Sequence, residues 1–175
     1  MALREAQLSD AEQIAMLHAA SWRATYRGMM PDQFLDGDVV SNRLQVWNTR
    51  LSRPQSNQFV CVAEDREGLV GFICVFGGED PIWGSCIDNL HVSSSRKRSG
   101  LGMALMQHAA AWLSRHHPQV PVYLWVMEAN SGARRFYERL GASNAGTFEK
   151  SNPSGGSAPN CRYVWAGPEQ LINAR

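Results

Sequence analysis

The sequence predicts a single domain of the α/β class that spans residues 1–175. Three observations support this prediction. A chain of 175 residues is long enough for one domain to bury a full hydrophobic core. Its apolar residues, 44% of the total, repeat with the period of a strand in some segments and with that of a helix in others. No internal repeat and no linker divides these segments, so we expect them to share one core.

The first half of the chain combines helical and strand-like segments. Ser9 and Glu12 are spaced as a capping box in front of an apolar helical stripe. Gly28 interrupts a segment rich in aromatic and basic side chains, and Pro54 follows the second helical region. In chain order we expect a strand at 3–5, a helix at 9–21, a turn or short helix at 21–31, a helical region at 34–51, and a hairpin of strands 59–64 and 69–76 around the turn 65–68.

The second half alternates between strands and helices. Glycines and a proline in the segment 77–81 are expected to end the preceding strand. A helix that begins near Asn130 should end at Gly141, because glycine readily adopts the left-handed conformation of a helix C-cap. The remaining expected elements are a strand at 85–92, a helix at 101–113, a strand at 121–127, and a closing hairpin of 147–148 and 162–165 around the loop 151–160.

The segment 90–103, which joins a strand to a helix, is the most informative part of the chain. The strand ends at Val92, and Gly100 and Gly102 open the amphipathic helix that follows. The first N–H groups of a helix have no partner within it, and glycine lets a ligand approach the backbone closely. Because the basic residues 96–98 flank these groups, the pattern predicts a pyrophosphate site.

Other interpretations of this loop fit less well. A dinucleotide-binding loop would require a small residue where the chain has Leu105, and it would follow a strand nearer the start of the fold. The phosphate loop of nucleoside triphosphatases would require Gly-x-x-x-x-Gly-Lys-Ser/Thr, which the chain lacks. The structural alternative is a glycine-rich turn at a solvated helix start.

Two segments of the chain resemble motifs of the GNAT acetyltransferases, and they occur in the same order as in that family. The strand end 90–92 and the segment 97–102 resemble the acetyl-CoA loop of that family, Arg/Gln-x-x-Gly-x-Gly/Ala after a strand that ends Leu-x-Val. The chain departs from the pattern at Lys97, where Arg or Gln is usual, and at Ser94, where proline is common. The segment 130–142 resembles the family's Asn-x-x-Ala-x-x-Phe-Tyr-x-x-x-Gly-Phe/Ala. Over residues 87–142 the resemblance includes the family's sequence motifs. Over the wider range 3–166 it extends only to the order of strands and helices.

This resemblance implies the GNAT acyl-CoA N-acyltransferase fold, in which a mixed α+β sheet splays between its fourth and fifth strands. It also implies direct transfer of an acetyl group from acetyl-CoA to a primary amine in a ternary complex. The alternative is a non-catalytic module that senses acyl-CoA. The residues that the resemblance assigns to the coenzyme are Leu90, His91, Val92, Lys97, Arg98, Ser99, Gly100, Leu101, Gly102, Met103, Asn130 and Tyr137.

Tyr137 matches the general acid of the family, which protonates or polarises the departing sulfur. If Tyr137 has no catalytic role, it is a tyrosine of the hydrophobic core. If Asn130 does not contact the coenzyme, it is a helix cap. The general base stays open, because Cys86 occupies the position where many relatives carry a glutamate. Asp88 and His91 are the candidates on the same strand, with Glu79 or a chain of waters as alternatives.

The acceptor site is expected among the first helices and the long loops. Trp22, Tyr26 and Arg27 could form an aromatic and basic wall that suits a small polar or carboxylate-bearing acceptor. Glu79 could instead attract a cationic amine. Because these signals point to opposite charges, the sequence predicts only a small-molecule or peptide amine as the partner.

Composition and charge exclude several function classes. The formal net charge of +1 gives no general attraction to nucleic acid or acidic membranes. No apolar run approaches the ~20 residues of a membrane span, and no signal peptide is recognisable, so we expect a cytoplasmic protein. The protein could be a monomer or a homodimer. No bound metal is expected. His108 is expected in the core and His18 at the surface. Buried free thiols are expected at Cys61, Cys74, Cys86 and Cys161.

Overall fold

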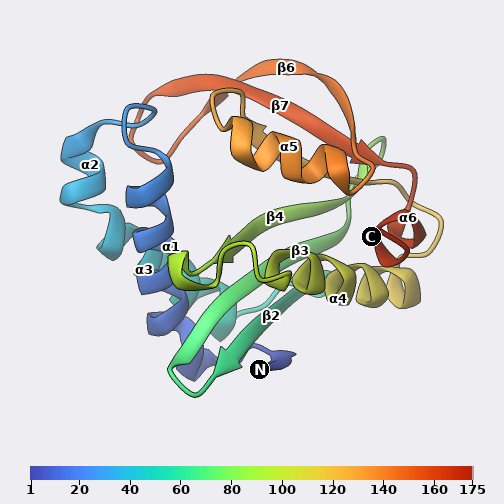
Figure 1. Cartoon of the computed structure of the whole chain (residues 1–175), viewed down its shortest axis with the longest axis horizontal. Helices are drawn as coiled ribbons and strands as arrows, with labels where there is room; N and C mark the ends of the chain where they lie inside the picture. Colours follow the sequence, from blue (N-terminus) through green and yellow to red (C-terminus); the bar gives the residue numbers. More distant parts are fainter. Residues whose placement is uncertain (175) are drawn as a thin grey trace.

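The computed structural model describes residues 1–174 as one seven-stranded sheet with helices on both faces (Figure 1). The strand order is β1-β2-β3-β4-β5-β7-β6, and each neighbouring pair is antiparallel except β4 and β5, which run parallel. The mixed sheet expected from the sequence is therefore confirmed. The strands are β1 (Ala2–Glu5), β2 (Gln58–Asp65), β3 (Gly68–Asp80), β4 (Gly84–Val92), β5 (Val122–Met127), β6 (Ser143–Ser151) and β7 (Ser157–Trp165).

The helices divide into two groups that cover opposite faces of the sheet (Figure 1). Helices α1 and α3 pack against each other and against one face, whereas α4, α5 and α6 pack on the other. The helices are α1 (Ala11–Thr25), α2 (Asp32–Asp36), α3 (Val39–Ser52), α4 (Leu101–His116), α5 (Ser131–Arg139) and α6 (Pro168–Ile172), with short 3-10 helices η1 (Leu8–Asp10) and η2 (Ser94–Arg96).

The central strand β3 shows why its sequence is apolar without interruption. Successive side chains of a strand point to opposite faces. Phe72 and Cys74 are buried under α1 and α3, while Ile73 and Val75 are buried under α4. Helix α4 approaches β3 closely at Gly71, where an added Cβ would lie 3.1 Å from Leu105 Cδ1. A strand that is covered on both faces loses the alternation of polar and apolar residues.

The sheet splays between β4 and β5. The two strands pair only where residues Ser85 to Ile87 face residues Val122 to Leu124. Beyond these residues β4 continues to Val92 beside β3, and β5 continues to Met127 beside β7. The edges of β4 and β5 that face each other there have no strand partner, so their backbone groups are available to a ligand. The expected splay between the fourth and fifth strands is confirmed.

Two local expectations were wrong. The chain begins its helical run at η1, where the Asp10 carboxylate accepts the Gln7 N–H at 2.8 Å and is held by Arg4, so Ser9 and Glu12 do not form the cap. The segment 77–81 does not end β3, which continues to Asp80 through an irregular register opposite β4. The glycines there allow close packing, since a Cβ at Gly77 would lie 2.0 Å from His117.

The C-terminal region also differs in detail. Strands β6 and β7 are longer than expected, so the loop between them shortens to 152–156, and α6 was not anticipated. The four cysteines are buried and free, as expected. His18 was placed wrongly at the surface, because it is fully buried, and His108 is partly exposed rather than in the core. Within residues 1–174, the structure has no helix that is long and apolar enough to cross a membrane.

Candidate active site

A cavity of about 830 Å³ opens where the sheet splays. Its walls come from α1, from the diverging ends of β4 and β5, from the loop before α4 and from α5. The structure brings most of the sequence-predicted site residues together here. They are Trp22, Tyr26, Asp88, Leu90, His91, Val92, Lys97, Arg98, Gly100, Gly102, Met103, Asn130 and Tyr137.

The start of α4, where the sequence predicts an anion site, lies at this cavity. Gly100 adopts a left-handed conformation, with φ of 84°, and no side chain caps the helix. The Ala104 N–H donates to Gly100 O at 3.0 Å, but within residues 1–174 the N–H groups of residues 98–103 have no acceptor. Unpaired N–H groups at the positive end of a helix dipole attract phosphate groups.

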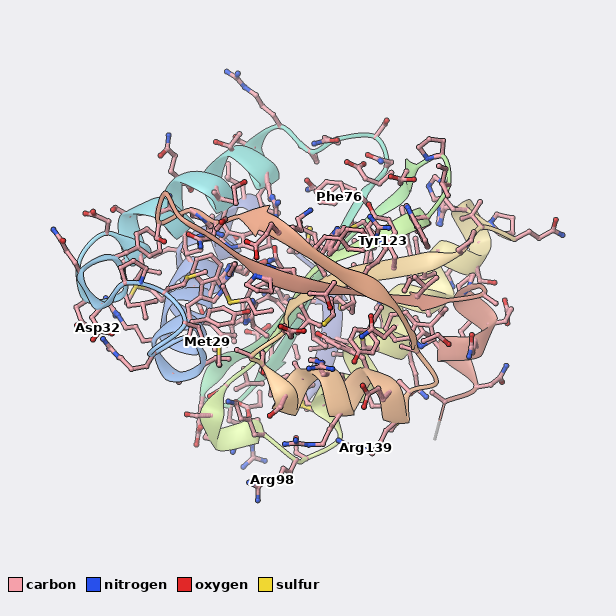
Figure 2. The ribbon with its side chains drawn as sticks, turned by 90° about the horizontal axis from the view of Figure 1, so that it is seen from above. Met29, Asp32, Phe76, Arg98, Tyr123 and Arg139 are labelled. Carbon is pink, nitrogen blue, oxygen red and sulfur yellow. The ribbon has the colours of Figure 1, made fainter. Side chains whose placement is uncertain are left out.

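Cations surround this helix start. Arg96 lines the cavity, but its charge is balanced by ion pairs with Asp65 at 2.8 Å and Glu67 at 3.3 Å on the hairpin of β2 and β3. Lys97 and Arg98 are exposed at the cavity. Helix α5 adds two arginines that were not predicted as site residues, Arg135 and Arg139. Figure 2 shows Arg98 and Arg139 on the same side of the molecule.

The two α5 arginines could have been found from their spacing. Residues four apart lie on the same face of a helix. Arg135 and Arg139 therefore share one face of α5, and both line the cavity. Together with the uncapped helix start, they provide the charges and N–H groups that a coenzyme pyrophosphate and its further phosphate require, so the residues present fit coenzyme A.

Tyr137, Asn130 and Tyr26 meet at the junction of α1 and α5. The Asn130 side chain caps α5 by accepting the Ala133 N–H at 3.2 Å, which is the structural role considered for it above. Asn130 also lines the cavity. Burial raises the pKa of Tyr26, and a hydrogen bond with the Asn130 side chain opposes that rise. Burial, and then the neighbouring Tyr26, raise the pKa of Tyr137 well above its usual value. Tyr137 therefore stays protonated at neutral pH.

His91 lines the cavity and belongs to a polar cluster in its wall. Its Nδ1 lies 2.8 Å from Ser21 Oγ, and its ring centroid lies 4.3 Å from that of His18. Burial, followed by the charges of Arg43 and Lys97, lowers the pKa of His91 to about 3. His91 is therefore neutral at physiological pH. No local pattern indicates this cluster, because its members lie far apart in the chain.

Asp88 is held by an ion pair. Its carboxylate lies 2.7 Å from Arg50 Nη1, and the same nitrogen donates to Asn89 at 2.8 Å. The side chain of Asp88 is still 35% exposed, so it is accessible from the cavity and from solvent. The register of β4 against β3 shifts here, which is typical of a β-bulge that re-aims side chains.

Four predicted site residues lie outside the cavity walls. Ser99 donates to Arg96 O at 2.7 Å, and Leu101 is buried in the core under α4. Arg27 is paired with Asp32 and Asp36 at the surface. Glu79 accepts a hydrogen bond from the Asn57 side chain at 3.1 Å. Ser99 and Leu101 could still contribute backbone N–H groups, but the structure does not bring Arg27 or Glu79 to the site.

Comparison with known proteins agrees with this geometry. Residues 15–142 match the model of the acetyltransferase (GNAT) family. The chain belongs to the GNAT family of acetyltransferases. It is 31% identical over 170 residues to a probable N-acetyltransferase of Mycobacterium tuberculosis, with 92% of this chain and 91% of that protein covered. It is 30% identical over 131 residues to the uncharacterized N-acetyltransferase YuaI of Bacillus subtilis, with 73% of this chain and 72% of that protein covered.

Among solved structures, the GNAT fold is shared with the PaiA N-acetyltransferase of Thermoplasma acidophilum, crystallised in complex with coenzyme A. The TM-score is 0.72 at 17% identity, with 94% of this chain and 98% of that one covered. The enzyme is thus a GNAT N-acetyltransferase, and enzymes of this family use acetyl-CoA and an amine acceptor. Within residues 1–174, no group of three or more His, Cys, Asp or Glu side chains is placed to hold a metal ion.

Proposed function

We propose that this enzyme transfers the acetyl group of acetyl-CoA directly to a primary amine of a small molecule or peptide, without a metal. The observation that carries the proposal is the position of Tyr137, which lines the same cavity as the uncapped start of α4. A binding loop alone would suit a sensor. A protonated tyrosine in the gap of the sheet suits an enzyme that must stabilise a departing thiolate.

The donor half of the site is provided mainly by backbone groups. N–H groups of residues 98–103 and the side chains of Lys97, Arg98, Arg135 and Arg139 would hold the phosphates. When bound, acetyl-CoA supplies an activated thioester. The backbone of Leu90 to Val92, which lacks a strand partner on its β5 side, can pair with the pantetheine amides and donate an N–H to the carbonyl oxygen.

The amine must lose a proton during the transfer. His91 is a weak base in this environment, because a group with a pKa of about 3 rarely holds a proton at neutral pH. Asp88 lines the cavity and is partly exposed, so it can pass a proton to solvent. We therefore assign the proton exit to Asp88 and a positioning role to His91. Charge on the departing sulfur is then relieved by the Tyr137 hydroxyl.

Thiol release tests the proposal directly. The purified enzyme is incubated with acetyl-CoA and a broad panel of amines, free coenzyme A is measured with a thiol reagent, and the acetylated amine is identified by mass. Amine-dependent release with formation of an N-acetyl product supports the proposal. Tight binding of acetyl-CoA in calorimetry without release for any amine would favour the sensor instead.

A further inference from the structure

A serine on α1 and a histidine on β4 form a hydrogen-bonded pair in the wall of the cavity. Ser21 lines the cavity, and its Oγ lies 2.8 Å from Nδ1 of His91, which lines the cavity as well. The two residues are 70 positions apart in the chain, so only the fold brings them together. Among the described residues, His91 is the only hydrogen-bond partner of the Ser21 side chain.

This contact differs from the usual one for a hydroxyl on a helix. Serine and threonine side chains within a helix commonly donate to a carbonyl of the preceding turn. Helix α3 follows this rule, because Ser41, Thr49 and Ser52 each donate to a backbone oxygen three or four positions earlier. The hydroxyl of Ser21 instead leaves its own helix and reaches β4. Local helix geometry therefore does not explain its position.

Packing holds the His91 ring on its other sides. The centroid of this ring lies 5.2 Å from that of Phe72 and 4.3 Å from that of His18. His18 is itself fixed, because its Nδ1 accepts the indole N–H of Trp47 at 3.0 Å. The position of His91 Nδ1 is therefore well defined, and the hydrogen bond transfers this definition to the Ser21 hydroxyl.

The pair lies on the acceptor side of the strand segment that would hold the thioester. Successive side chains of a strand point to opposite faces. Leu90 and Val92 pack against the core under α4, on the face where the phosphates would bind. His91, between them, faces α1 and contacts His18. An amine that approaches the backbone of residues 90–92 from the α1 side therefore passes beside Ser21.

The donors and acceptors of the pair suit an amine nucleophile. A neutral imidazole has one ring nitrogen that donates and one that accepts. We assign the proton of neutral His91 to Nε2, because the Ser21 O–H has no acceptor other than His91 Nδ1 among the described residues. The lone pairs of Ser21 Oγ then remain for a ligand. An amine attacks with its own lone pair, so it binds to the protein through its N–H groups and requires such acceptors.

We propose that Ser21 accepts an N–H of the incoming amine and that His91 positions the Ser21 hydroxyl for this contact. The inference rests on the proposed function and adds a residue to its acceptor site. Ser21 would orient the nitrogen lone pair toward the thioester carbon, and orientation of a nucleophile contributes strongly to enzymatic rates. A neutral hydroxyl also suits this position better than a carboxylate, which favours the ammonium form and thereby removes the lone pair.

Ser21→Ala tests the contact with the amine. Thiol release from acetyl-CoA is measured with spermidine, tyramine, glycinamide and a lysine-containing peptide, and the variant is compared with the unmodified enzyme on the amine that reacts fastest. We expect kcat/KM for this amine to fall by about tenfold, the effect of one well-placed hydrogen bond. The factor should be the same from pH 6 to 9, because a hydroxyl does not titrate there. The dissociation constant of coenzyme A, measured by calorimetry, should not change.

Thr25→Val is the matched control for this variant. Thr25 lies one turn further along α1, lines the same cavity, and has no side-chain hydrogen bond to another described residue. Loss of its hydroxyl should change kcat/KM by less than about threefold. A loss as large as that of Ser21→Ala would show that this wall responds to polarity in general, and it would overturn the inference.

A double-mutant cycle tests the positioning role of His91. His91→Phe keeps the ring packing against His18 and Phe72 and removes both ring nitrogens. The effects of two residues that act through one contact are not additive. We therefore expect the variant with both Ser21→Ala and His91→Phe to be no slower than the slower single variant. Additive losses would show that His91 acts independently of Ser21, which contradicts the positioning role.

The remaining outcomes separate the inference from the proposed function. If amines react and Ser21→Ala keeps the unmodified rate, the enzyme is an N-acetyltransferase but Ser21 does not bind the amine. If Ser21→Ala lowers the melting temperature and weakens coenzyme A binding as well, its role is structural and the inference is wrong. If no amine releases coenzyme A, the proposed function itself fails, and the inference fails with it.

Discussion

Tyr137 illustrates how the surroundings of one side chain change its acid–base chemistry. Burial and the nearby Tyr26 raise its pKa above the usual value for tyrosine. A thiol has a reference pKa near ~8.5, so full proton transfer from Tyr137 to a thiolate is unfavourable in the resting site. The hydroxyl can still donate a hydrogen bond as charge develops on the sulfur. Such partial transfer is sufficient for general acid catalysis.

Replacement of Tyr137 by phenylalanine should slow the chemical step and leave coenzyme binding intact. The ring contacts with Phe136 and Trp165 persist, and only the hydroxyl is lost. General acid catalysis is typically worth ~100- to ~10,000-fold, so we expect kcat to fall within that range. Single-turnover kinetics measures the rate, and calorimetry with coenzyme A measures binding.

Tyr163→Phe is the matched control for this variant. The Tyr163 hydroxyl contacts Glu138 and Arg134 in the fold and does not line the cavity. This change should cost about 1 kcal/mol of stability and leave kcat close to that of the unmodified enzyme. If Tyr137→Phe keeps the wild-type rate of the chemical step, Tyr137 has only a packing role and is not the general acid.

Asp88 and His91 are separated by the pH dependence of the rate. If Asp88 passes the amine proton to solvent, Asp88→Asn should be slowest near pH 7 and recover toward pH 9, where more of the amine is already neutral. His91→Asn should lower the rate by a similar factor across this range, because the pKa of His91 lies near 3, far below it. Steady-state kcat/KM profiles from pH 6 to 9 distinguish the two patterns. If the rate recovers at high pH only in His91→Asn, then His91 passes the proton and Asp88 has the positioning role.

The sequence could predict residues that belong to local motifs but not those that meet through the fold. Tyr137 and Asn130 were found because their helix carries a recognisable spacing. Arg43 and His18 had no such signal, since their partners Trp22 and His91 are brought to them only by the packing of α3 on α1 and of α1 on β4. Local spacing in the sequence carries no information about such tertiary neighbours.

At the scale of the element, the start of α4 combines two properties that a substitution can separate. An acidic side chain in the first turn of a helix stabilises it through the helix dipole. The same charge would repel phosphate groups. At Gly102 an added Cβ would lie 3.4 Å from Phe136 Cζ, which is ordinary contact, so the backbone accepts a side chain there.

Gly102→Asp should therefore fold normally and bind coenzyme A at least about tenfold more weakly. Gly102→Ala, the control, adds the Cβ without the charge and should lose less affinity. Calorimetry gives the dissociation constants, and thermal unfolding verifies that both variants are folded. If Asp and Ala weaken binding equally, the helix start is sensitive to bulk rather than to charge. If neither variant weakens binding, the phosphates lie elsewhere.

Element boundaries show where local signals fail. The hairpin of β2 and β3, the helix α5 and its end at Gly141, with φ of 85°, follow from local sequence as expected. The extension of β3 past Gly77 does not, because pairing with β4 and contact with His117 override the tendency of glycine to end a strand. Packing partners that are distant in sequence decide these boundaries.

At the scale of the whole molecule, the buried histidines link the site to the stability of the fold. His18 is fully buried, and its Nδ1 accepts the indole N–H of Trp47 at 3.0 Å, while its Nε2 has no partner among the described residues. His91 lies beside it. Both pKa values are lowered, first by burial, so the folded chain holds both rings neutral where the unfolded chain, with values near 6.5, begins to bind protons.

Stability should therefore fall as the pH drops below about 6.5. The unfolded state binds more protons than the folded state in this range, so the free energy of unfolding decreases as pH decreases, by up to about 1.4 kcal/mol per pH unit for each histidine. Carboxylates such as Asp10 and Asp65, whose pKa values are lowered, add their own losses only at more acidic pH, below about 4. Urea unfolding at pH 7.5, 6.5, 5.5 and 5.0 measures the slope, and His91→Asn should reduce it by about half because one of the two proton sites is removed. A free energy of unfolding that stays constant from pH 6.5 to 5.0 would show that the folded chain protonates these rings as readily as the unfolded chain, and that His91 is available as a base after all.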